Sequence, residues 1–432
     1  PLVSPRAWAA LEAHAGSVAA LARCRPDLVG VFGPLFPACR SARCVPLRAR
    51  LCVLREETEL FVDSRHLHAT LRRDRALEDL FDQLMRPEWE GPGGLAGCRL
   101  SVQFQGEPGH GDGVVREALQ LVADRLLGEA FCPWPAPTSE GAGDGGPWRQ
   151  LDPAGALGPG GIGWRFVGRL LGLAVAAGCQ VRLGLAPWLW KELLGAEPSL
   201  DDLAGDEPFH RSVRALLAHP MSHDANAWAR GALSFGRHTS APGHPFVEFV
   251  EGGRDVAVTD ENKSRWAELY ARHRMRHVRG VPTGPMVEAL RRGFFDVLSR
   301  RAVQRFLPEE LERVVCGVSS LSPAGWRAAT RYRGLRAGDD LARWLWDAVE
   351  AFSEGQRLEL LRFWSGSPVL PPGGFEGVEF TVALNPHRGA DSLPEASTCF
   401  RTLRLPSYPS QAVLREKLAK AVELGSAGFC FA

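Results

Sequence analysis

The spacing of apolar residues changes several times along the chain and predicts a mixture of strands and helices. Leu100, Val102 and Phe104 alternate with polar neighbours, which is typical of a strand with one buried face. In the next stretch, "VVREALQLVADRLLG", apolar residues recur every three or four positions, so a helix is predicted. Further helices are predicted around Leu170 and in "APWLWKELLG", where Gly195 supplies the stop.

The beginning of the chain is predicted to be helical and to pack on the main body as an extension. "AWAALEAHAGSVAALARC" has a helical period, which "GVFGPLFP" then breaks. We therefore expect residues 1–66 to form a helical extension. A charged amphipathic helix is expected from about Leu67. Residues 133–163 are rich in Gly, Pro, Ser and Asp, and are expected to form a long loop.

The middle of the chain suggests two further divisions. Residues 209–280 alternate helices with short strands and Gly/Pro turns, which favours a small inserted subdomain. Helices are predicted from Pro285 to Glu350. Within this region "RYRGLRAGDD" is short, polar and contains two glycines, as expected of a hinge between two units. We place this hinge at 333–340.

The end of the chain combines strands with a closing helix. "GVEFTVAL" predicts a strand. Ser410 is a suitable N-cap for the last helix, whose apolar stripe contains Val413, Leu414, Leu418 and Val422. This helix offers a rigid support for the segment that precedes it.

Length and composition restrict the class of protein. A chain of 432 residues is long enough for two or three cooperative units, and 45% apolar with 23% charged residues is ordinary for a soluble globular protein. The formal net charge of +1 gives no reason to expect nucleic acid or an anionic membrane as a partner. The longest apolar run, "FVGRLLGLAVAAGCQV", carries Arg169 and is too short to span a bilayer. Its Gly168 and Gly172 instead favour close helix packing.

The ten cysteines are too few for a disulfide scaffold. Cys39, Cys44 and Cys52 cluster, but no CxxC pairs or histidine partners accompany them, so a zinc site is not expected. "GEPGHGDG" lacks the residues of a phosphate loop, and no nucleotide, metal or other cofactor is expected. No signal peptide is evident, so a reduced, cytoplasmic protein is expected. Because the chain begins without methionine, we expect it to be a fragment of a longer protein.

One cysteine near the end of the chain lies in an unusual setting. "LPEASTCFRTLRLPSYPS" places Cys399 between Pro394 and Pro406, and these prolines oppose a helix through the loop. A turn between packed elements would expose the thiol, and a thiolate is a strong nucleophile. No histidine lies beside Cys399, and His387 is twelve residues upstream. From the residues alone, a buried structural thiol and a reactive nucleophile both remain open.

These same residues resemble the C-terminal signature of the HECT family of ubiquitin ligases. Leu-Pro, Thr-Cys-Phe, Leu-Pro-x-Tyr, a helix and a terminal Gly-Phe follow one another as in that family. Further matching segments in family order are "VQFQGE", "VVRE", "FVGRLLGLA", "VTDENK", "GFFDVL", "ELERVVCG", "TRYRG" and "LLRFWSGSPVLPPGGF". The resemblance covers the chain from about Leu67 to Ala432. Around Cys399 the likeness is greatest to a branch of the family that acts in the regulation of apoptosis.

The resemblance implies an α+β, bilobal fold. A mostly helical N-lobe is expected at 67–332, with a small E2-binding subdomain inserted at about 209–280. A flexible hinge is expected at 333–340, followed by a small α/β C-lobe at 341–432. The expected partners are an E2 ubiquitin-conjugating enzyme, ubiquitin and protein substrates, with no nucleic acid and no membrane span.

The resemblance also implies roles for single residues. Cys399 matches the catalytic cysteine, which would accept ubiquitin from an E2 thioester and pass it to a substrate lysine. Thr398 and Phe400 match residues that shape the loop, and Phe429 matches an aromatic that acts when ubiquitin leaves the cysteine. In the small subdomain, the segment containing Phe235 and Phe246 is expected to contact the E2.

Two departures from the family pattern and two alternative functions are relevant. Ser397 stands where many members have histidine, so that position provides no imidazole base, and Ser365 replaces a frequent threonine. A cysteine hydrolase of ubiquitin conjugates is an alternative that would require His387 and Asp391 to act on Cys399. A catalytically silent HECT scaffold that binds E2 or ubiquitin is the second alternative.

Overall fold

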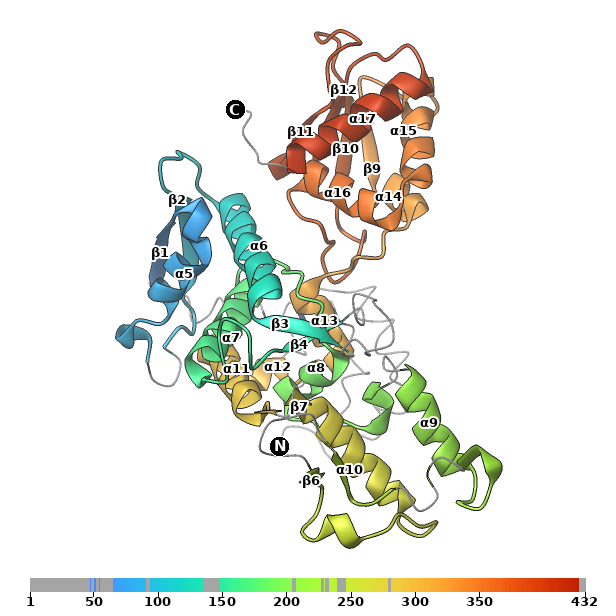
Figure 1. Ribbon diagram of the computed structural model, residues 1–432. Helices are drawn as coiled ribbons and strands as arrows, with labels where there is room; N and C mark the ends of the chain where they lie inside the picture. The colour runs from blue at the N-terminus through green and yellow to red at the C-terminus, as the bar shows by residue number, and fades with distance from the viewer. Residues whose placement is uncertain are drawn as a thin grey trace, which may run out of the picture.

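The fold of the chain is known from a computed structural model (Figure 1). The structure describes residues 65–90, 94–134, 148–203, 207–226, 229, 233–238, 246–278 and 281–426, together with positions 47, 50, 51 and 54. Almost all of the extension expected at 1–66, with Cys39, Cys44 and Cys52, therefore lies outside the described residues. The described residues bury three separate apolar clusters, which define an N-terminal unit, a small unit and a C-terminal unit.

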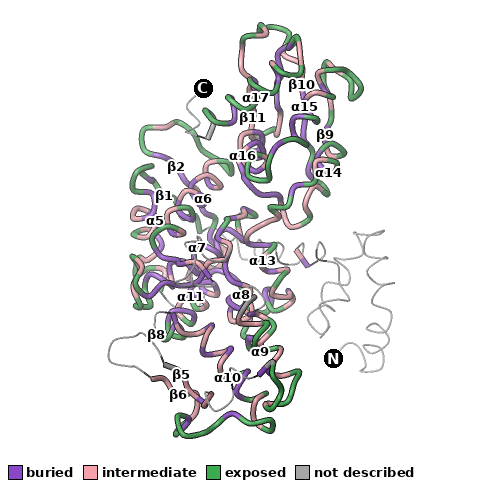
Figure 2. Tube along the Cα trace, turned by 45° about the vertical axis from the view of Figure 1, so that its right-hand side comes forward, coloured by how far each residue is buried: buried purple, intermediate pink, exposed green. Residues whose placement is uncertain are grey.

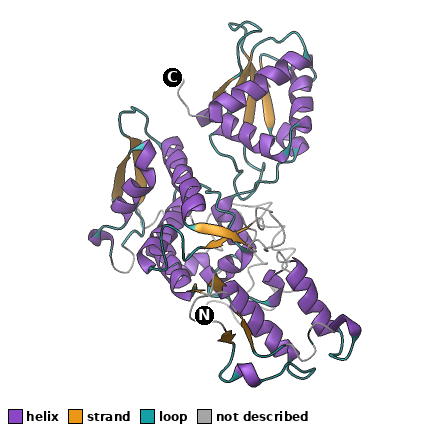
Figure 3. Ribbon diagram, viewed as in Figure 1, coloured by secondary structure: helices purple, strands orange, loops and turns teal. Residues whose placement is uncertain are grey.

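The elements follow one another through these units in chain order (Figures 1 and 3). The N-terminal unit begins with β1 (His66–Leu71), η3 (Arg73–Arg75), α5 (Ala76–Leu84), η4 (Pro87–Trp89), β2 (Arg99–Phe104), α6 (Asp112–Glu129), β3 (Phe131–Trp134), β4 (Trp148–Leu151), α7 (Gly161–Ala176) and α8 (Pro187–Leu194). The small unit contains η5 (Leu200–Leu203), α9 (Glu207–Ala218), η6 (Asp224–Asn226), β5 (Gly236–His238), β6 (Phe246–Glu248), η7 (Gly253–Asp255) and α10 (Lys263–Arg276). The chain returns to the N-terminal unit through β7 (His277–Val278), β8 (Val281–Pro282), α11 (Gly284–Val297), α12 (Arg300–Val303) and α13 (Pro308–Cys316). The C-terminal unit contains α14 (Pro323–Ala328), β9 (Thr330–Arg333), α15 (Asp340–Ala351), α16 (Glu354–Ser365), β10 (Phe380–Leu384), β11 (Glu395–Ser397), η8 (Thr398–Phe400), β12 (Thr402–Leu405) and α17 (Gln411–Ser426).

A parallel pair of strands forms one edge of the N-terminal unit. β1 pairs with β2, and Leu71 lies opposite Phe104. The strand expected around Val102 is confirmed as β2, and the helix that follows it is α6. The amphipathic helix expected from about Leu67 is wrong at its start. Exposed and buried residues alternate strictly in β1, and this period of two suits pairing with β2, so the helix α5 begins only at Ala76.

The segment expected to be a long loop at 133–163 contains strand pairing at its start. β3 and β4 run antiparallel, with Phe131 opposite Leu151, and α7 begins at Gly161. Residues 135–147 lie outside the described residues. The polar, Gly-rich composition therefore indicated the connection but not the two strands that bound it.

The helices α7 and α11 cross at very short range and form the centre of the N-terminal unit. Gly168 of α7 lies against α11, where an added Cβ would come within 2.6 Å of the Phe294 nitrogen. Gly293 of α11 lies in the same way against the backbone of Arg165. Figure 2 shows buried positions along both helices. The close packing expected from Gly168 and Gly172 is therefore present.

The charge in the apolar run of α7 is paired inside the N-terminal unit. Arg169 is fully buried and donates to Asp296 of α11 at 2.7 Å and to the carbonyl of Leu84 at 2.6 Å. Arg165 donates to the same carboxylate at 2.7 Å. A buried charge of this kind is tolerated because its partners are fixed around it. Among the helices described, none combines the length and the apolar composition needed to cross a bilayer.

The small unit has its own apolar cluster, which lies within the segment 209–280. Val213 and Leu216 of α9 pack with Phe235, which directly precedes β5, and with Trp266 of α10. The indole of Trp266 donates to the carbonyl of Ser234 at 2.8 Å, which fixes α10 to the strands of this unit.

The C-terminal unit is a four-stranded sheet packed with helices. The strand order is β11-β12-β10-β9, with β9, β10 and β12 parallel and β11 antiparallel to β12. The sheet and the helices bury Trp326, Trp346, Trp364 and Phe380 in one aromatic cluster. The strand expected in "GVEFTVAL" is β10, and the closing helix is α17, where the Val413 nitrogen donates to the Ser410 hydroxyl.

The hinge expected at 333–340 does not join two units. β9 pairs with β10 inside the C-terminal sheet, so residues 334–339 form a loop between two elements of the same unit. The chain passes from the N-terminal unit to the C-terminal unit at an earlier position. The Val181 nitrogen donates to the Val315 carbonyl in the N-terminal unit at 2.9 Å, and Val318 exchanges hydrogen bonds with Leu370 in the C-terminal unit at 2.9 and 3.0 Å. Only Cys316 and Gly317 separate these two attachments, so the boundary expected at 332 moves to about 317.

Candidate active site

Cys399 lies in a one-turn helix between two strands of the C-terminal unit. β11 ends at Ser397, η8 spans Thr398–Phe400, and β12 begins at Thr402. The prolines expected to oppose a helix here still leave room for a single 3-10 turn. This turn brings Cys399 to one end of the sheet, beside the beginning of β10.

The residue after this turn has a left-handed backbone. Arg401 has φ 46° and ψ 45°, and it is the only non-glycine residue with positive φ in the part of the chain that the structure describes. Its nitrogen donates to the Thr398 carbonyl at 3.2 Å, which closes the turn. Such a conformation costs of the order of 1 kcal/mol for a non-glycine residue, so neighbouring contacts must hold it in place.

Two buried groups hold the carbonyl of Arg401. The Trp364 indole nitrogen donates to it at 2.8 Å, and the Thr381 backbone nitrogen donates at 2.9 Å. Trp364 is fully buried in the aromatic cluster of the C-terminal unit. The orientation of the Cys399 turn is therefore tied to the core of this unit.

The end of α16 forms the surface beneath the turn. Gly366 has φ 76°, and its Cα faces Thr398, whose Cβ would lie 3.4 Å from an added Cβ. The adjoining Ser365 is buried, and its hydroxyl donates to the Leu361 carbonyl at 2.7 Å. The hydroxyl of Ser365 thus fixes the end of α16.

The residues expected to support Cys399 lie in different places. Thr398 lies beside Gly366, with its Cβ 3.4 Å from the position of a Cβ added there. Phe400 is 78% exposed, so its ring does not pack against the loop. Ser397 pairs with Thr402 at the end of β11. Phe429 lies outside the described residues.

The histidine required by a hydrolase lies at the other end of the sheet. Thr381, at the beginning of β10, is opposite Thr402 and receives the turn, whereas His387 follows the last residue of β10, Leu384. Three residues of strand already span about 10 Å. His387 and Asp391 are both exposed. The turn and the His387 loop are thus at opposite ends of β10, so the structure does not place His387 for a triad with Cys399.

Arg401, which directly follows the Cys399 turn, carries a positive charge. The guanidinium of Arg401 is half-buried, and this burial, together with the charge of Arg116 on α6, lowers the pKa of Arg401. Arg401 nevertheless stays protonated at neutral pH, as arginines do in proteins.

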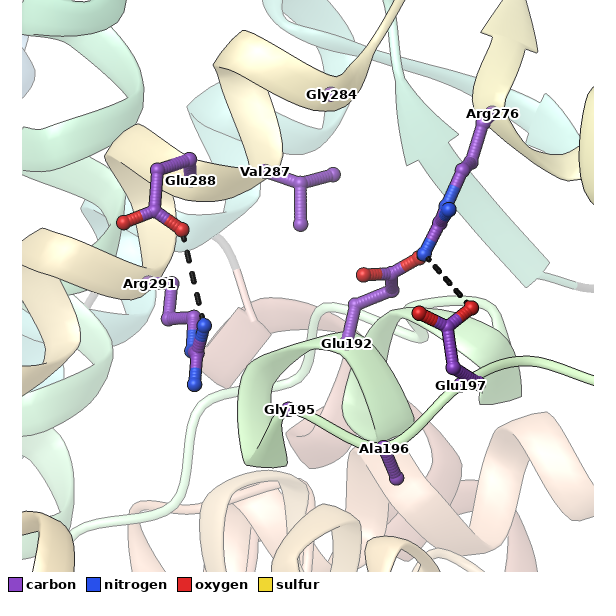
Figure 4. A pocket seen from close by; sticks show the side chains of 9 residues that line it. All are labelled: Glu192, Gly195, Ala196, Glu197, Arg276, Gly284, Val287, Glu288 and Arg291. Atoms are coloured by element: carbon purple, nitrogen blue, oxygen red, sulfur yellow. Dashed lines mark hydrogen bonds and ion pairs between the residues drawn. The ribbon is translucent and has the colours of Figure 1, made fainter.

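A cavity of about 290 Å³ lies away from this turn, where α8, α10 and α11 meet (Figure 4). Arg276 donates to Glu192 at 2.6 Å and approaches Glu197 at 3.4 Å across it. All the residues that line it belong to elements outside the C-terminal unit. It is a charged junction and does not contribute to the surroundings of Cys399.

The comparison with family models decides the family. Residues 138–432 match the model described as "HECT-domain (ubiquitin-transferase)". The chain belongs to the HECT family. The matched segment includes the whole C-terminal unit and the turn that carries Cys399, so the α+β fold expected from the sequence is confirmed.

Comparison with individual proteins gives the same family. The chain is 30% identical to E3 ubiquitin-protein ligase HACE1 of Gallus gallus over 344 residues, which are 77% of this chain and 35% of that protein. It is 31% identical to E3 ubiquitin-protein ligase Smurf1 of Drosophila melanogaster over 340 residues, 75% of this chain and 30% of that protein. It is 34% identical to E3 ubiquitin-protein ligase HECW1 of Homo sapiens over 366 residues, 82% of this chain and 22% of that protein. The HECT chain thus spans about a third of these relatives or less.

The structure adds residues that sequence reasoning did not select and corrects one that it did. Trp364, Gly366 and Arg401 hold the turn of this HECT domain, and none of them was selected from the sequence for this role. Phe235 is buried in the small unit with 3% exposure, so it cannot contact an E2 as it stands. Phe246 is half-buried on β6 beneath the guanidinium of Arg254, 4.6 Å from the ring centre.

Proposed function

We propose that this chain is the catalytic part of an E3 ubiquitin ligase that accepts ubiquitin from an E2 thioester on Cys399 and transfers it to substrate lysines. The observation that carries this proposal is the presentation of Cys399 at the centre of a one-turn helix between two strands, with exposed Phe400 beside it. Membership of the HECT family supports the same activity.

The proposed reaction has two steps. The thiolate of Cys399 attacks the carbonyl carbon of the E2–ubiquitin thioester, a new C–S bond forms, and the E2 cysteine leaves as a thiolate. Because one thioester replaces another, this step needs little driving force and depends on proximity and orientation. In the second step a neutral lysine amine attacks the new thioester, the amide bond forms, the amine proton passes to solvent, and Cys399 leaves as a thiolate.

The residues around Cys399 take supporting roles in this proposal. Thr398 acts as a positioning residue because it packs against Gly366. The exposure of Phe400 favours contact with a bound partner over shaping of the loop. We assign Phe429 to the step in which ubiquitin leaves Cys399, on the family likeness alone.

The small unit is the proposed docking site of the E2. It is a separate cluster of elements, and Phe246 with the stacked Arg254 presents an apolar and cationic surface there. An E2 bound at this unit must bring its sulfur to Cys399 in another unit. We therefore expect rotation about Gly317 to close the gap between the two sulfurs.

We further propose a cytoplasmic location and a role in the regulation of apoptosis. The free thiols of Cys98 and Cys179 suit a reducing compartment. The role in apoptosis rests only on the sequence likeness around Cys399. Unidentified protein substrates complete the proposed partners.

A charging assay tests the proposed function. The chain is incubated briefly with E1, ATP, labelled ubiquitin and a panel of E2s, and the products are separated with and without a thiol reductant. We expect a reductant-sensitive ubiquitin adduct on the unaltered chain and none on Cys399→Ala.

The outcomes separate the alternatives. E2 binding without an adduct would favour the silent HECT scaffold. Reaction with ubiquitin that carries a C-terminal electrophile, in the absence of any E2, would favour the hydrolase. An adduct that persists in Cys399→Ala would assign the acceptor to a different residue.

A further inference from the structure

Lysine is scarce in this chain, which restricts where the chain itself can be modified. Lys191, Lys263, Lys417 and Lys420 are its only lysines among 51 basic residues, and the rest are arginine. Transfer of ubiquitin from a thioester needs an amine with a free lone pair. A neutral lysine offers one, whereas the guanidinium of arginine stays protonated in proteins. The surroundings of four side chains therefore decide which positions can accept ubiquitin.

Two of the four lysines are held by hydrogen bonds. The Nζ of Lys191 donates to Asp202 at 2.7 Å, and the Asp202 side chain is only 8% exposed. The Nζ of Lys263 donates to the His219 carbonyl at 2.6 Å and to Asp260 at 2.9 Å. For Lys191 to act as an acceptor, a nearly buried carboxylate would have to lose its cation, and Lys263 would have to give up two hydrogen bonds. These two lysines are therefore poor acceptors.

The other two lysines lie on the outer side of α17. Leu414 and Leu418 belong to the buried face of this helix, whereas Lys420 is exposed and Lys417 is half-buried at the edge of the same outer side. Within the part of the chain that the structure describes, neither amine takes part in a hydrogen bond or an ion pair. Both amines can therefore approach a thioester without breaking a contact.

The arrangement of the C-terminal unit keeps Lys420 away from the thioester of its own chain. Leu418 of α17 and Leu403 of β12 belong to one buried cluster, so α17 and the Cys399 turn are parts of the same unit. Rotation about Gly317 moves Cys399 and Lys420 together and cannot bring them closer. Because Leu418 faces the sheet and Lys420 faces away from it, the helix, about 10–12 Å across, lies between the Lys420 amine and the strands that carry the turn (Figure 1). A thioester on Cys399 is thus accessible to Lys420 of a second copy.

Each of the two reacting groups has an exposed apolar side chain beside it. Phe400, next to Cys399, is 78% exposed, and Leu424, one turn beyond Lys420 on α17, is 50% exposed. These are the two exposed large apolar side chains in the described part of the C-terminal unit. Contact between Phe400 of one copy and Leu424 of another would remove apolar surface from water and place the Lys420 amine near the thioester.

We propose that the charged chain ubiquitinates a second copy of itself at Lys420, with Lys417 as the secondary acceptor. The inference rests on the proposed function, because it names a substrate for the second step of that reaction. The neutral amine of Lys420 attacks the carbonyl carbon of the thioester on Cys399 of the other copy. A C–N bond forms, the C–S bond breaks, the amine proton passes to solvent, and Cys399 leaves as a thiolate.

An assay with two distinguishable copies tests this inference. The acceptor is Cys399→Ala with a lysine-free affinity tag, the donor is the untagged, unaltered chain, and E1, an E2, ATP and lysine-free ubiquitin are supplied. We expect ubiquitin on the acceptor, and peptide mapping should place most of it on Lys420. The yield should rise with the concentration of the donor, because the transfer takes place between molecules.

Matched variants of the acceptor assign the site. Lys417→Arg combined with Lys420→Arg should lower the yield about tenfold or more, because arginine keeps the charge but offers no free lone pair. Lys191→Arg combined with Lys263→Arg is the control and should leave the yield unchanged. Leu424→Ser keeps all four lysines and should lower the yield several-fold by removing the apolar contact. The donor is the same in every mixture, so these differences do not depend on charging.

The failure of this inference differs from the failure of the proposed function. Absence of a reductant-sensitive adduct on the donor would overturn the ligase assignment. A charged donor that leaves the acceptor unmodified, or an acceptor modified equally well without Lys417 and Lys420, would overturn the inference and leave the ligase assignment intact.

Discussion

Individual side chains in the core of the C-terminal unit fix the position of the Cys399 turn. Trp364 combines a fully buried ring with a hydrogen bond to the carbonyl of Arg401. Its neighbour Trp326 is equally buried, with ring centres 5.3 Å apart, but its indole nitrogen has no hydrogen-bond partner among the described residues. The two tryptophans therefore separate the effect of ring packing from the effect of the bond to the turn.

Replacing Trp364 tests how far the turn depends on that bond. Trp364→Phe keeps an aromatic ring but removes one of the two donors to the Arg401 carbonyl, which costs about 0.5–1.5 kcal/mol in addition to packing because the Thr381 nitrogen still donates. We expect lower thermal stability and a several-fold lower rate of charging on Cys399. Trp326→Phe should lose only packing and charge at nearly the normal rate. Equal charging rates for the two variants would show that the bond does not position the turn.

At the same scale, a buried histidine makes the folding stability of the small unit depend on pH. His273 on α10 is buried against Phe249 and His277, with ring centres 5.2 and 3.9 Å away. This burial lowers the pKa of His273 to about 3, while an unfolded histidine has a pKa near 6.5. Between these values the unfolded chain binds more protons than the folded chain, so stability falls as the pH falls from about 6.5 toward 3.

The size of this effect is measurable in a single variant. Each pH unit in the window costs up to about 1.4 kcal/mol for one fully coupled group. We expect the urea midpoint to drop between about pH 7.5 and about pH 5, and His273→Phe to flatten that drop. The exposed His387→Gln serves as the control and should leave it unchanged. A drop that is identical in His273→Phe would assign the titration to other groups.

At the scale of elements, the crossing of α7 and α11 determines the shape of the N-terminal unit. Gly168 and Gly293 bring each helix against the backbone of the other, and Asp296 of α11 links to Arg169 of α7 within the same contact. Helices packed so closely gain van der Waals contact over their whole length. They have little freedom to accept any added atom.

Alanine substitutions distinguish this crossing from ordinary helical glycines. Gly168→Ala places a methyl group on the Leu290 carbonyl and should destabilise the protein by about 1–3 kcal/mol or more. Gly128, near the end of α6, has open space around its Cα, so Gly128→Ala should be neutral or stabilise by up to about 1 kcal/mol. Thermal unfolding measures both. An unchanged unfolding temperature for Gly168→Ala would mean that the two helices can move apart without loss of stability.

At the scale of the whole molecule, the connection between the units limits how Cys399 can move. Hydrogen bonds fix Val315 to the N-terminal unit and Val318 to the C-terminal unit, which leaves Gly317 as the pivot. Gly317 has φ 73° and ψ −163°, a conformation that is open essentially to glycine alone. An added Cβ would also meet the Leu370 carbonyl.

If Gly317 is the pivot, a substitution there should affect the charging of Cys399 without affecting E2 binding. Gly317→Ala should change the arrangement of the units and reduce charging of Cys399 by roughly tenfold or more, while E2 binding to the small unit stays the same. Gly338→Ala is the matched control, because Gly338 lies in the loop within the C-terminal unit and has open space around it. Charging rates and E2 affinity would be measured for both variants. A larger effect from Gly338→Ala would restore the hinge to 333–340.

The sequence by itself determined the features that depend on neighbouring residues. The period of two around Val102, the helical period of α6 and the stop at Gly195 all reflect local geometry, and each appears in the structure. The ordered motifs around Cys399 were sufficient to indicate the family. The two glycines of α7 likewise predicted a close helix contact, although not which helix would fill it.

The tertiary structure decided the features that depend on pairing between distant segments. β9 reads as a polar linker until β10 pairs with it, so the hinge could be located only from contacts. The burial of Phe235 and the exposure of Phe400 follow from packing between segments far apart in the chain. Hydrogen bonding and burial at long range leave no regular pattern in a single sequence, whereas helical and strand periods do.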